Sequence, residues 1–326
     1  MERASLSSYL ICYQGGEIVA NELVDNTEVK LKRNKYSKLA KKEWLAAYLF
    51  LLPAAIFFIG FVIIPMIGGI VISFFDYTPR TMDFIGLQNY IQILKDPIFK
   101  KSLGNTMFLV IGTVPIVIVF SMFVSLTIYK RSSKVRSFFR SIFYLPAIAS
   151  VVSIAVVWGW IFHPNYGILN YILSFFGVEP QVWLGNPSTA KWAILMVLVT
   201  LSVGQPIVLY MASLGNIPKD YLEAAQIDGA NARQVFWNIT WPLLKPTTLY
   251  IVIITTINSF QCFSVIQLLT AGGPNYSTTT IMYQVYEKSF TLGQYGIASS
   301  MGVVLAVIVM AISVVQYKYF GSDVEY

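Results

Sequence analysis

Long apolar stretches separated by short polar links dominate the pattern of this chain. Six stretches reach or approach the ~20 residues that a helix needs to cross a bilayer. They lie at about 44–75, 105–129, 141–162, 190–214, 247–269 and 297–317. These stretches show almost none of the polar stripe that a helix of a soluble protein carries. The pattern therefore predicts an all-α integral membrane protein with six transmembrane helices.

Prolines and polar breaks modify this pattern at a few places. Pro53 and Pro65 lie inside the first stretch and predict a first span that is kinked or split. Pro146 permits a bend in the third stretch, whereas the later spans are expected to be more regular. Between the first two stretches, residues 84–106 predict a short amphipathic helix that ends at Asp96. This helix is expected to cover one end of the bundle.

Basic residues cluster beside the predicted spans. The net charge is +7, with one basic run at 30–42 and another at 130–140. Because short loops rich in Lys and Arg stay on the cytoplasmic side, both runs and both termini are predicted to be cytoplasmic. Nucleic-acid binding explains the runs less well, since they sit at span boundaries. The predicted organisation is a cytoplasmic tail (1–43), a six-span domain (44–320) with a cytoplasmic loop (216–246), and a short C-terminal tail (321–326).

Groups that could perform chemistry inside the membrane are missing from the sequence. The six stretches contain no Asp or Glu, and the only histidine, His163, lies at the outer end of the third. Ion-coupled carriers commonly use intramembrane carboxylates, and enzymes need a nucleophile beside a base or a metal. Cys12 and Cys262 fall in the tail and inside a span, so they cannot pair. No catalytic, metal-binding or cofactor-binding residue is predicted, and no GxxxxGK[ST] loop for ATP occurs.

The polar segment between the fourth and fifth stretches is itself patterned as two short helices. Pro218 suits a first helical turn, and Gly229 suits the left-handed conformation that closes a helix. Asn231 with Gln234 three residues later forms a variant of the capping box. The second helix is predicted to begin there and to stop before Pro242. The apolar side chains of the pair need a cover, either the chain's own bundle or a partner protein.

The stretch EAAQIDGANARQVFWNITWPLLKP resembles the EAA motif of ATP-binding-cassette (ABC) importer permeases. Trp241 departs from the motif, where the family usually has Leu, but it keeps the bulk and hydrophobicity. The resemblance implies a cytoplasmic coupling helix pair that docks into a cleft of an ATPase. The residues that it assigns to this coupling are Glu223, Ala224, Ala225, Asp228, Gly229, Ala230, Phe236, Ile239 and Pro242.

The resemblance extends from about residue 44 to the C-terminus. GLQNY, FFRSIFYLP and TAGGPNYSTTT look like segments of carbohydrate-uptake permeases of the maltose and glycerol-phosphate transporter type, and AGGP points to the first of two permease subunits. The implied fold is that of a type I ABC importer permease in the bacterial cytoplasmic membrane. The implied partners are a second permease subunit, two ATPase copies that hold ATP and Mg, and an extracytoplasmic solute-binding protein.

Polar side chains are few in the fourth and fifth stretches, and a sugar path needs such groups around a cavity. Thr255, Asn258 and Gln261 recur every three residues in the fifth. By resemblance, the maltose permease binds sugar at positions that align with Thr200, Gly204 and Gln261. The predicted pathway residues are Thr200, Gly204, Gln205, Asn258 and Gln261. The same residue types also join membrane helices by hydrogen bonds, and the pattern leaves both roles open.

The sequence therefore predicts a permease subunit of an ATP-driven, binding-protein-dependent importer. It would move a carbohydrate, such as an oligosaccharide, inward by alternating access, without enzymatic activity of its own. The alternative is a self-sufficient secondary carrier, which would transport with an ion gradient and no partner.

Overall fold

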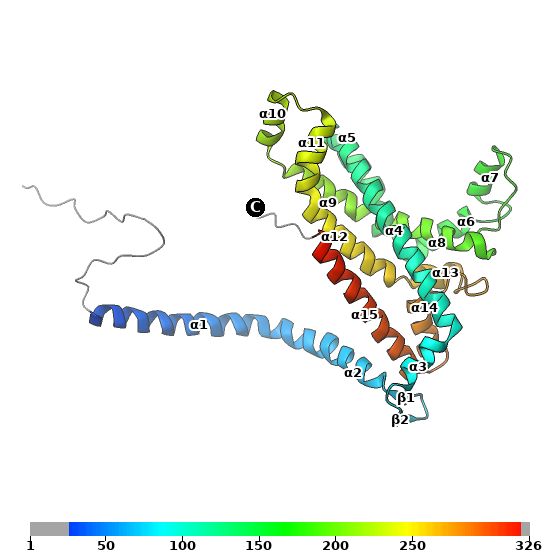
Figure 1. The fold of residues 1–326 in the computed structure, drawn as a ribbon, viewed down its shortest axis with the longest axis horizontal. Coiled ribbons are helices and arrows are strands. Elements are labelled where there is room, and N and C mark those ends of the chain that lie inside the picture. The colour runs from blue at the N-terminus through cyan, green and yellow to red at the C-terminus, as the bar shows by residue number, and fades with distance from the viewer. Residues whose placement is uncertain (1–25, 321–326) are drawn as a thin grey trace, which may run out of the picture. The chain divides into compact units, whose positions relative to one another are not determined.

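The computed structural model describes residues 26–320 (Figure 1). The predictions for residues 1–25 and for the C-terminal tail 321–326 fall outside the described residues. Helix α1 (Asn26–Phe58) is the first element. The boundary predicted at residue 43, between tail and first span, therefore falls inside a helix.

The described residues form two compact units, which divide between Pro65 and Met66. The first span is one helical run, because a single candidate membrane helix covers Ala40–Ile72. Within it, η1 (Ile59–Ile63) forms a π-helical turn before α2 (Ile64–Ile72) begins. The wider turn makes room for the ring of Pro65, which would clash with the carbonyl four residues earlier in a regular α-helix. The span is therefore not split into two helices, and the predicted kink stays a prediction.

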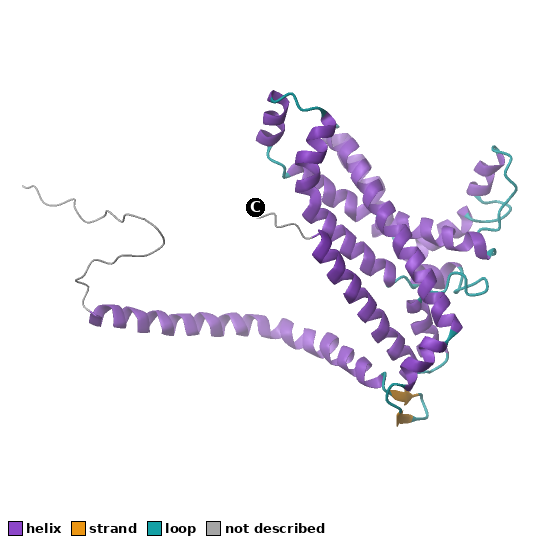
Figure 2. Ribbon diagram, viewed as in Figure 1, coloured by secondary structure: helices purple, strands orange, loops and turns teal. Residues whose placement is uncertain are grey.

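A small β-hairpin, which the sequence did not predict, follows the first span. Strands β1 (Phe75–Tyr77) and β2 (Met82–Phe84) pair antiparallel and are drawn in orange in Figure 2. The predicted short helix is present as α3 (Gln88–Lys95). The side chain of Asp96 then accepts a hydrogen bond of 2.8 Å from a backbone N–H in the first turn of α4 (Pro97–Tyr129). Because this cap starts α4, the second helix begins before the predicted position 105.

The third and fourth spans are each broken into two helices. Helices α5 (Ser133–Ile148) and α6 (Val151–Ile161) meet at 101°, so the bend permitted near Pro146 is present. Helices α8 (Pro187–Ser202) and α9 (Gly204–Gly215) meet at 40°. The predicted regularity of the fourth span is therefore wrong. The bend has a physical cause in Pro206, which has no N–H to donate to the carbonyl four residues earlier, at the end of α8.

The fifth span continues directly from the predicted helix pair. Helix α10 (Lys219–Ile227) is followed by α11 (Ala232–Val235), the π-helical turn η2 (Phe236–Thr240) and α12 (Trp241–Phe260). The last three form one candidate membrane helix of 29 residues. The span was predicted to run regularly to residue 269, but α12 ends earlier, so this prediction is also wrong.

Shorter elements and the sixth span complete the chain. Helix α15 (Tyr295–Phe320) contains the last candidate span. The elements between the longer helices are α7 (Ile168–Ser174), α13 (Ser264–Leu269), α14 (Ile281–Tyr286) and η3 (Glu287–Thr291). Four helices are long and apolar enough to cross a membrane, and the two bent pairs raise the number to six in the described part of the chain.

Helix α4 occupies the centre of the second unit and packs against α8, α9 and α12 (Figure 1). On α4, Ser121 donates a hydrogen bond of 3.3 Å to the carbonyl of Val203, directly before α9, and Ser125 donates one of 3.1 Å to the carbonyl of Ile207 in α9. These small side chains let the two helices approach closely. Helices α10 and α11 lie at one end of this unit, and the hairpin lies at the opposite end (Figure 1).

Candidate functional site

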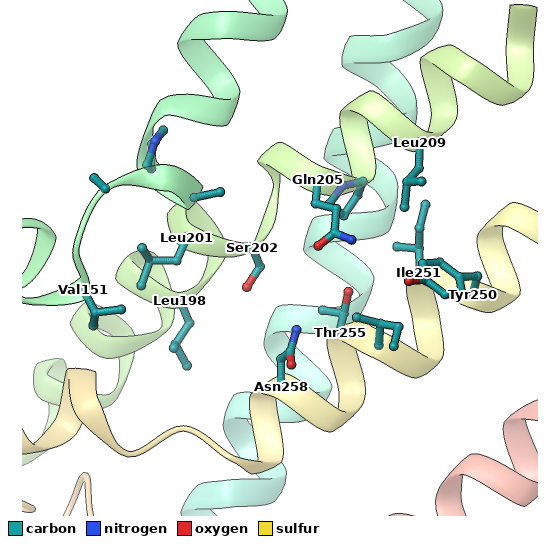
Figure 3. A pocket seen from close by; sticks show the side chains of 15 residues that line it. Val151, Leu198, Leu201, Ser202, Gln205, Leu209, Tyr250, Ile251, Thr255 and Asn258 are labelled. Atoms are coloured by element: carbon teal, nitrogen blue, oxygen red, sulfur yellow. The ribbon is translucent and has the colours of Figure 1, made fainter. Parts of the chain in front are cut away.

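A cavity of about 320 Å³ lies where the two broken spans meet α12 (Figure 3). The break between α5 and α6 supplies one wall, and the break between α8 and α9 supplies another. The lining residues are Pro146, Ala147, Ala149, Val151, Leu198, Leu201, Ser202, Gln205, Pro206, Leu209, Tyr250, Ile251, Ile254, Thr255 and Asn258. No side chain in this lining carries a charge.

The two side-chain amides of the cavity come from α9 and α12. Gln205 on α9 and Asn258 on α12 extend into the cavity from opposite sides (Figure 3). Both side chains are exposed, and neither amide forms a hydrogen bond with another group of the described residues. They do not join helices to one another here. Their free donors and acceptors are therefore available to a solute that carries hydroxyl groups.

The other predicted pathway residues lie outside this lining. The hydroxyl of Thr200 donates a hydrogen bond of 2.9 Å to the carbonyl of Met196, one turn earlier in the same helix. Gln261 is exposed just beyond the end of α12. Contact between solute and either residue stays a prediction.

Gly204, another predicted pathway residue, is buried at the crossing of α9 and α5. A Cβ at this position would lie 2.6 Å from the carbonyl oxygen of Phe143. Only a residue without a side chain lets the two backbones approach this closely. The structure therefore gives Gly204 a packing role beside the cavity.

Sequence reasoning missed several residues of the lining. Ser202 and Tyr250 were not selected, although each contributes a polar group. Ser202 ends α8, and the bend after it decides which way its hydroxyl points. The signal that could have found it is Pro206, four residues later, which predicts a helix break at this point.

The helix pair between the fourth and fifth spans has the predicted turn. Gly229 has φ of +72°, which is the left-handed conformation. The N–H of Ala230 donates to the carbonyl of Ala225 over 2.9 Å and closes α10. The predicted capping box is also present. Asn231 and Gln234 each bond the other's backbone N–H through a side-chain oxygen, at 3.0 and 2.8 Å.

The second helix of the pair does not stop before Pro242, and that prediction is wrong. The turn η2 closes with the N–H of Trp241 donating to the carbonyl of Phe236, five residues earlier. A π-helical turn widens the helix ahead of the proline, so that its ring is accommodated without a break. The helix therefore continues from the pair into the cavity wall.

A groove of about 360 Å³ lies between the two arms of the pair. Its lining is mostly apolar and consists of Tyr221, Ala224, Ala225, Asp228, Asn238, Ile239, Pro242 and Leu243. Five of the predicted coupling residues line it. Of the others, Glu223 and Gly229 are exposed, Ala230 is half-buried, and Phe236 packs against the bundle core beside Leu244.

The bundle covers only part of this helix pair. Ile227 is 87% exposed, and Tyr221 and Trp237 are each 55% exposed. Apolar side chains at the end of a cytoplasmic or external loop are costly to leave in water. Contact with the bundle therefore accounts for the partial burial of Phe236. It leaves the other three side chains uncovered in the described part of the chain.

Metal binding finds no support in the side chains. Among the described residues, no group of three or more His, Cys, Asp or Glu side chains could hold a metal ion.

Comparison with known proteins gives relatives of one kind, the membrane components of transport systems. The model of the family described as "Binding-protein-dependent transport system inner membrane component" matches residues 99–325. The probable ABC transporter permease YurN of Bacillus subtilis is 34% identical over 283 residues, which cover 85% of this chain and 97% of that protein. The trehalose/maltose transport system permease MalF of Thermococcus litoralis is 34% identical, over 88% of this chain and 98% of that protein.

Two solved structures of ABC transporters are also similar to this chain. A chain of a bacterial ABC transporter that imports the acidic polysaccharide alginate is 25% identical, with a TM-score of 0.77, over 89% of this chain and 100% of that chain. The alginate transporter in complex with an alginate pentasaccharide-bound periplasmic protein gives 26% identity and a TM-score of 0.75, over 86% and 95% of the two chains.

Proposed function

This chain belongs to the family of inner membrane components of binding-protein-dependent transport systems, and we propose that it forms one half of the path by which a carbohydrate enters the cell. Its fold is that of a type I ABC importer permease. It is a multi-pass membrane protein and a transporter subunit.

One observation carries this proposal. A single helical run from Ala232 to Phe260 joins the groove of the helix pair to the cavity. Ile239 and Pro242 line the groove near one end of this run, and Thr255 and Asn258 line the cavity near the other. A displacement of the helix pair by a bound partner would therefore move one wall of the cavity as a rigid body.

The partner at the helix pair is, in this proposal, a cytoplasmic ATPase, with two copies per importer. ATP and Mg would bind to the ATPase, and this chain would hold no cofactor. ATP binding would favour the outward-facing state, because the ATP-bound ATPase would contact the helix pair differently in the two states. Hydrolysis would release that bias. The helix pair and both termini would then lie in the cytoplasm, as the basic link at 130–140 favours.

The remaining partners follow from the architecture of such importers. Among the described residues, the walls of the cavity come from α5, α6, α8, α9 and α12, and a second, related permease subunit would close it from the other side. A solute-binding protein outside the membrane would deliver the carbohydrate. This chain would be the first of the two permease subunits, as its AGGP segment indicates.

The substrate class follows from the lining and from the relatives. Amide and hydroxyl groups beside an uncharged wall suit the hydroxyl groups of a neutral sugar. A volume of about 320 Å³ is at the lower end of the roughly 300–1,000 Å³ of ligand pockets, so this subunit would hold part of an oligosaccharide. The relative named for trehalose/maltose transport supports this class.

The test is uptake by the whole importer in liposomes. The chain is reconstituted with its sister permease, its ATPase and its binding protein, and radiolabelled maltose and arabino-oligosaccharides are supplied outside. Uptake should require enclosed ATP and the binding protein and should be insensitive to ionophores. Uptake by this chain alone, driven by a proton or sodium gradient, would favour the secondary carrier instead.

A further inference from the structure

The link between α4 and α5 forms a hollow that the proposed transport does not use. It has a volume of about 290 Å³ and lies between the end of α4, the start of α5 and the middle of α9. One side offers hydrogen-bond donors and the other is apolar. The residues that give it this character are Tyr129, Ser133, Arg136, Arg140, Val208 and Met211.

The donors are arranged on one face. Ser133, Arg136 and Arg140 follow one another at spacings of three and four residues along α5, which places them on one side of the helix. The guanidinium carbon of Arg136 lies 5.8 Å from the centre of the Tyr129 ring. This cation–π contact holds the half-buried Arg136 over the tyrosine ring. Two guanidinium groups and two hydroxyl groups therefore border one small volume.

Among residues 26–320, no side chain of the lining neutralises the two positive charges. The lining contains no Asp or Glu. The sequence has none between Asp96 and Glu179, so the neighbouring turns supply none either. Two arginines that line one hollow, with no carboxylate in the described part of its lining, suit an anion from outside the chain, and their planar donors fit phosphate oxygens in pairs.

The surroundings of the hollow are those of a membrane boundary. The candidate span in α4 ends at Tyr129, beside the hollow. On α5, Phe139 lies three residues after Arg136 and is 39% exposed, and Phe138 and Ile142, farther round the helix, are 62% and 48% exposed. Acyl chains can cover such a face, whereas a free phosphate ion would leave it and the apolar side of the hollow bare.

We propose that this hollow binds the phosphate of an anionic phospholipid. Arg136 and Arg140 bind its phosphate oxygens, Tyr129 and Ser133 donate further hydrogen bonds, and the acyl chains lie along the exposed apolar face of α5. Basic pockets between membrane helices suit such lipids, because the phosphate pairs with the positive charges while the acyl chains cover the apolar surface. The lipid would then fill the junction of α4, α5 and α9.

The test measures lipids that stay bound to the purified importer complex. The complex is incubated with equal amounts of dioleoylphosphatidylglycerol and dioleoylphosphatidylcholine, and retained lipids are counted by native mass spectrometry. The wild type should retain the anionic lipid in preference. Arg136→Gln and Arg140→Gln should each lower that preference about threefold to tenfold, as the loss of one charged hydrogen bond predicts. Lys134→Gln, which removes the same charge from an exposed side chain outside the hollow, should leave it unchanged.

Several results would overturn the proposal. These are equal retention of the two lipids by the wild type, an unchanged preference in both arginine variants, or an equal fall in Lys134→Gln. Displacement of the lipid by millimolar inorganic phosphate would assign the hollow to a free anion instead. Loss of the ATPase from both arginine variants, with the lipid preference intact, would assign the arginines to a protein contact.

A measurement on the wild type covers the case in which the arginine variants do not assemble. Raising the salt concentration to about 0.5 M shortens the Debye length to a few ångströms and should reduce the preference for the anionic lipid. A preference that salt does not change would contradict the role of the two arginines.

Discussion

The hydroxyl of Tyr210 on α9 donates a hydrogen bond of 3.1 Å to the hydroxyl of Thr248 on α12, and both side chains are buried. Nearby, Thr247 on α12 donates a hydrogen bond of 3.0 Å to Ser213, three residues after Tyr210 on α9. These bonds tie together the two helices that flank the helix pair and line the cavity. A displacement of the pair would therefore move both helices together.

Replacing Tyr210 by phenylalanine should loosen this connection with little change in packing. Thr248 keeps its own bond to the carbonyl of Leu244, so only one hydrogen bond is lost. The expected loss of stability is about 0.5–1.5 kcal/mol. Uptake per ATP hydrolysed should fall, while the yield of the complex stays near wild type. Tyr317→Phe, at an exposed position, is the control, and an equal loss of uptake per ATP in both variants would contradict the connection.

Leucine at position 205 or 258 should reduce uptake without loss of assembly. Gln205 and Asn258 extend into the cavity, and neither amide bonds another group among residues 26–320. A role in binding solute predicts an uptake loss of about tenfold or more, since one or two hydrogen bonds to the sugar disappear. Gln267→Leu, at an exposed position outside the cavity lining, is the control. A complex yield that falls in proportion to uptake would favour a role in helix packing.

Gly204→Ala should destabilise the protein by about 1–3 kcal/mol, because the new Cβ would lie 2.6 Å from the carbonyl oxygen of Phe143. The measurement is the temperature at which the detergent-solubilised complex unfolds. Gly215 is the last residue of the same helix, and no atom lies within 4 Å of a Cβ built there. Gly215→Ala should therefore leave this temperature nearly unchanged. Equal unfolding temperatures for the two variants would refute the close packing of α5 and α9.

The proposed orientation predicts opposite labelling of two single cysteines. A cysteine at position 191, near the start of α8, should react with an impermeant maleimide in intact cells. A cysteine at position 227, where the isoleucine is 87% exposed, should react only in inverted vesicles. The positions of the basic runs require this difference. Labelling of position 227 from outside intact cells would reverse the topology.

The local signals of the helix pair were sufficient to predict its turn. Gly229 acts through its own backbone, and Asn231 and Gln234 act through side-chain bonds to backbone groups three residues away, so both signals are local, and the structure has both. Pro242 was misleading, because a proline that stops a helix and one that follows a π-helical turn look alike in sequence. The identity of the residue does not say which neighbours relieve the clash.

The breaks in the spans were harder to predict than the spans themselves. A membrane helix can end at Ala149 or Val203 only where neighbouring helices satisfy the freed backbone groups, and those contacts are tertiary. The cavity follows from the breaks. Gln205 and Asn258 could be selected by polarity, but Ser202 faces the cavity because of the bend that follows it.

The central claim is that the helix pair couples a partner ATPase to the cavity, and Gly229 tests it most directly. No atom lies within 4 Å of a Cβ built at this residue, so a substitution acts through the backbone at φ of +72° and not through a clash. Valine resists this conformation, at a cost of about 1–3 kcal/mol, whereas asparagine tolerates it. The measurement is binding-protein-stimulated ATPase activity and carbohydrate uptake in liposomes that contain the whole importer. Gly229→Val should lose most of both activities, and Gly229→Asn should stay close to wild type. Wild-type activity in the valine variant would contradict the coupling role and make the helix pair an ordinary part of the bundle.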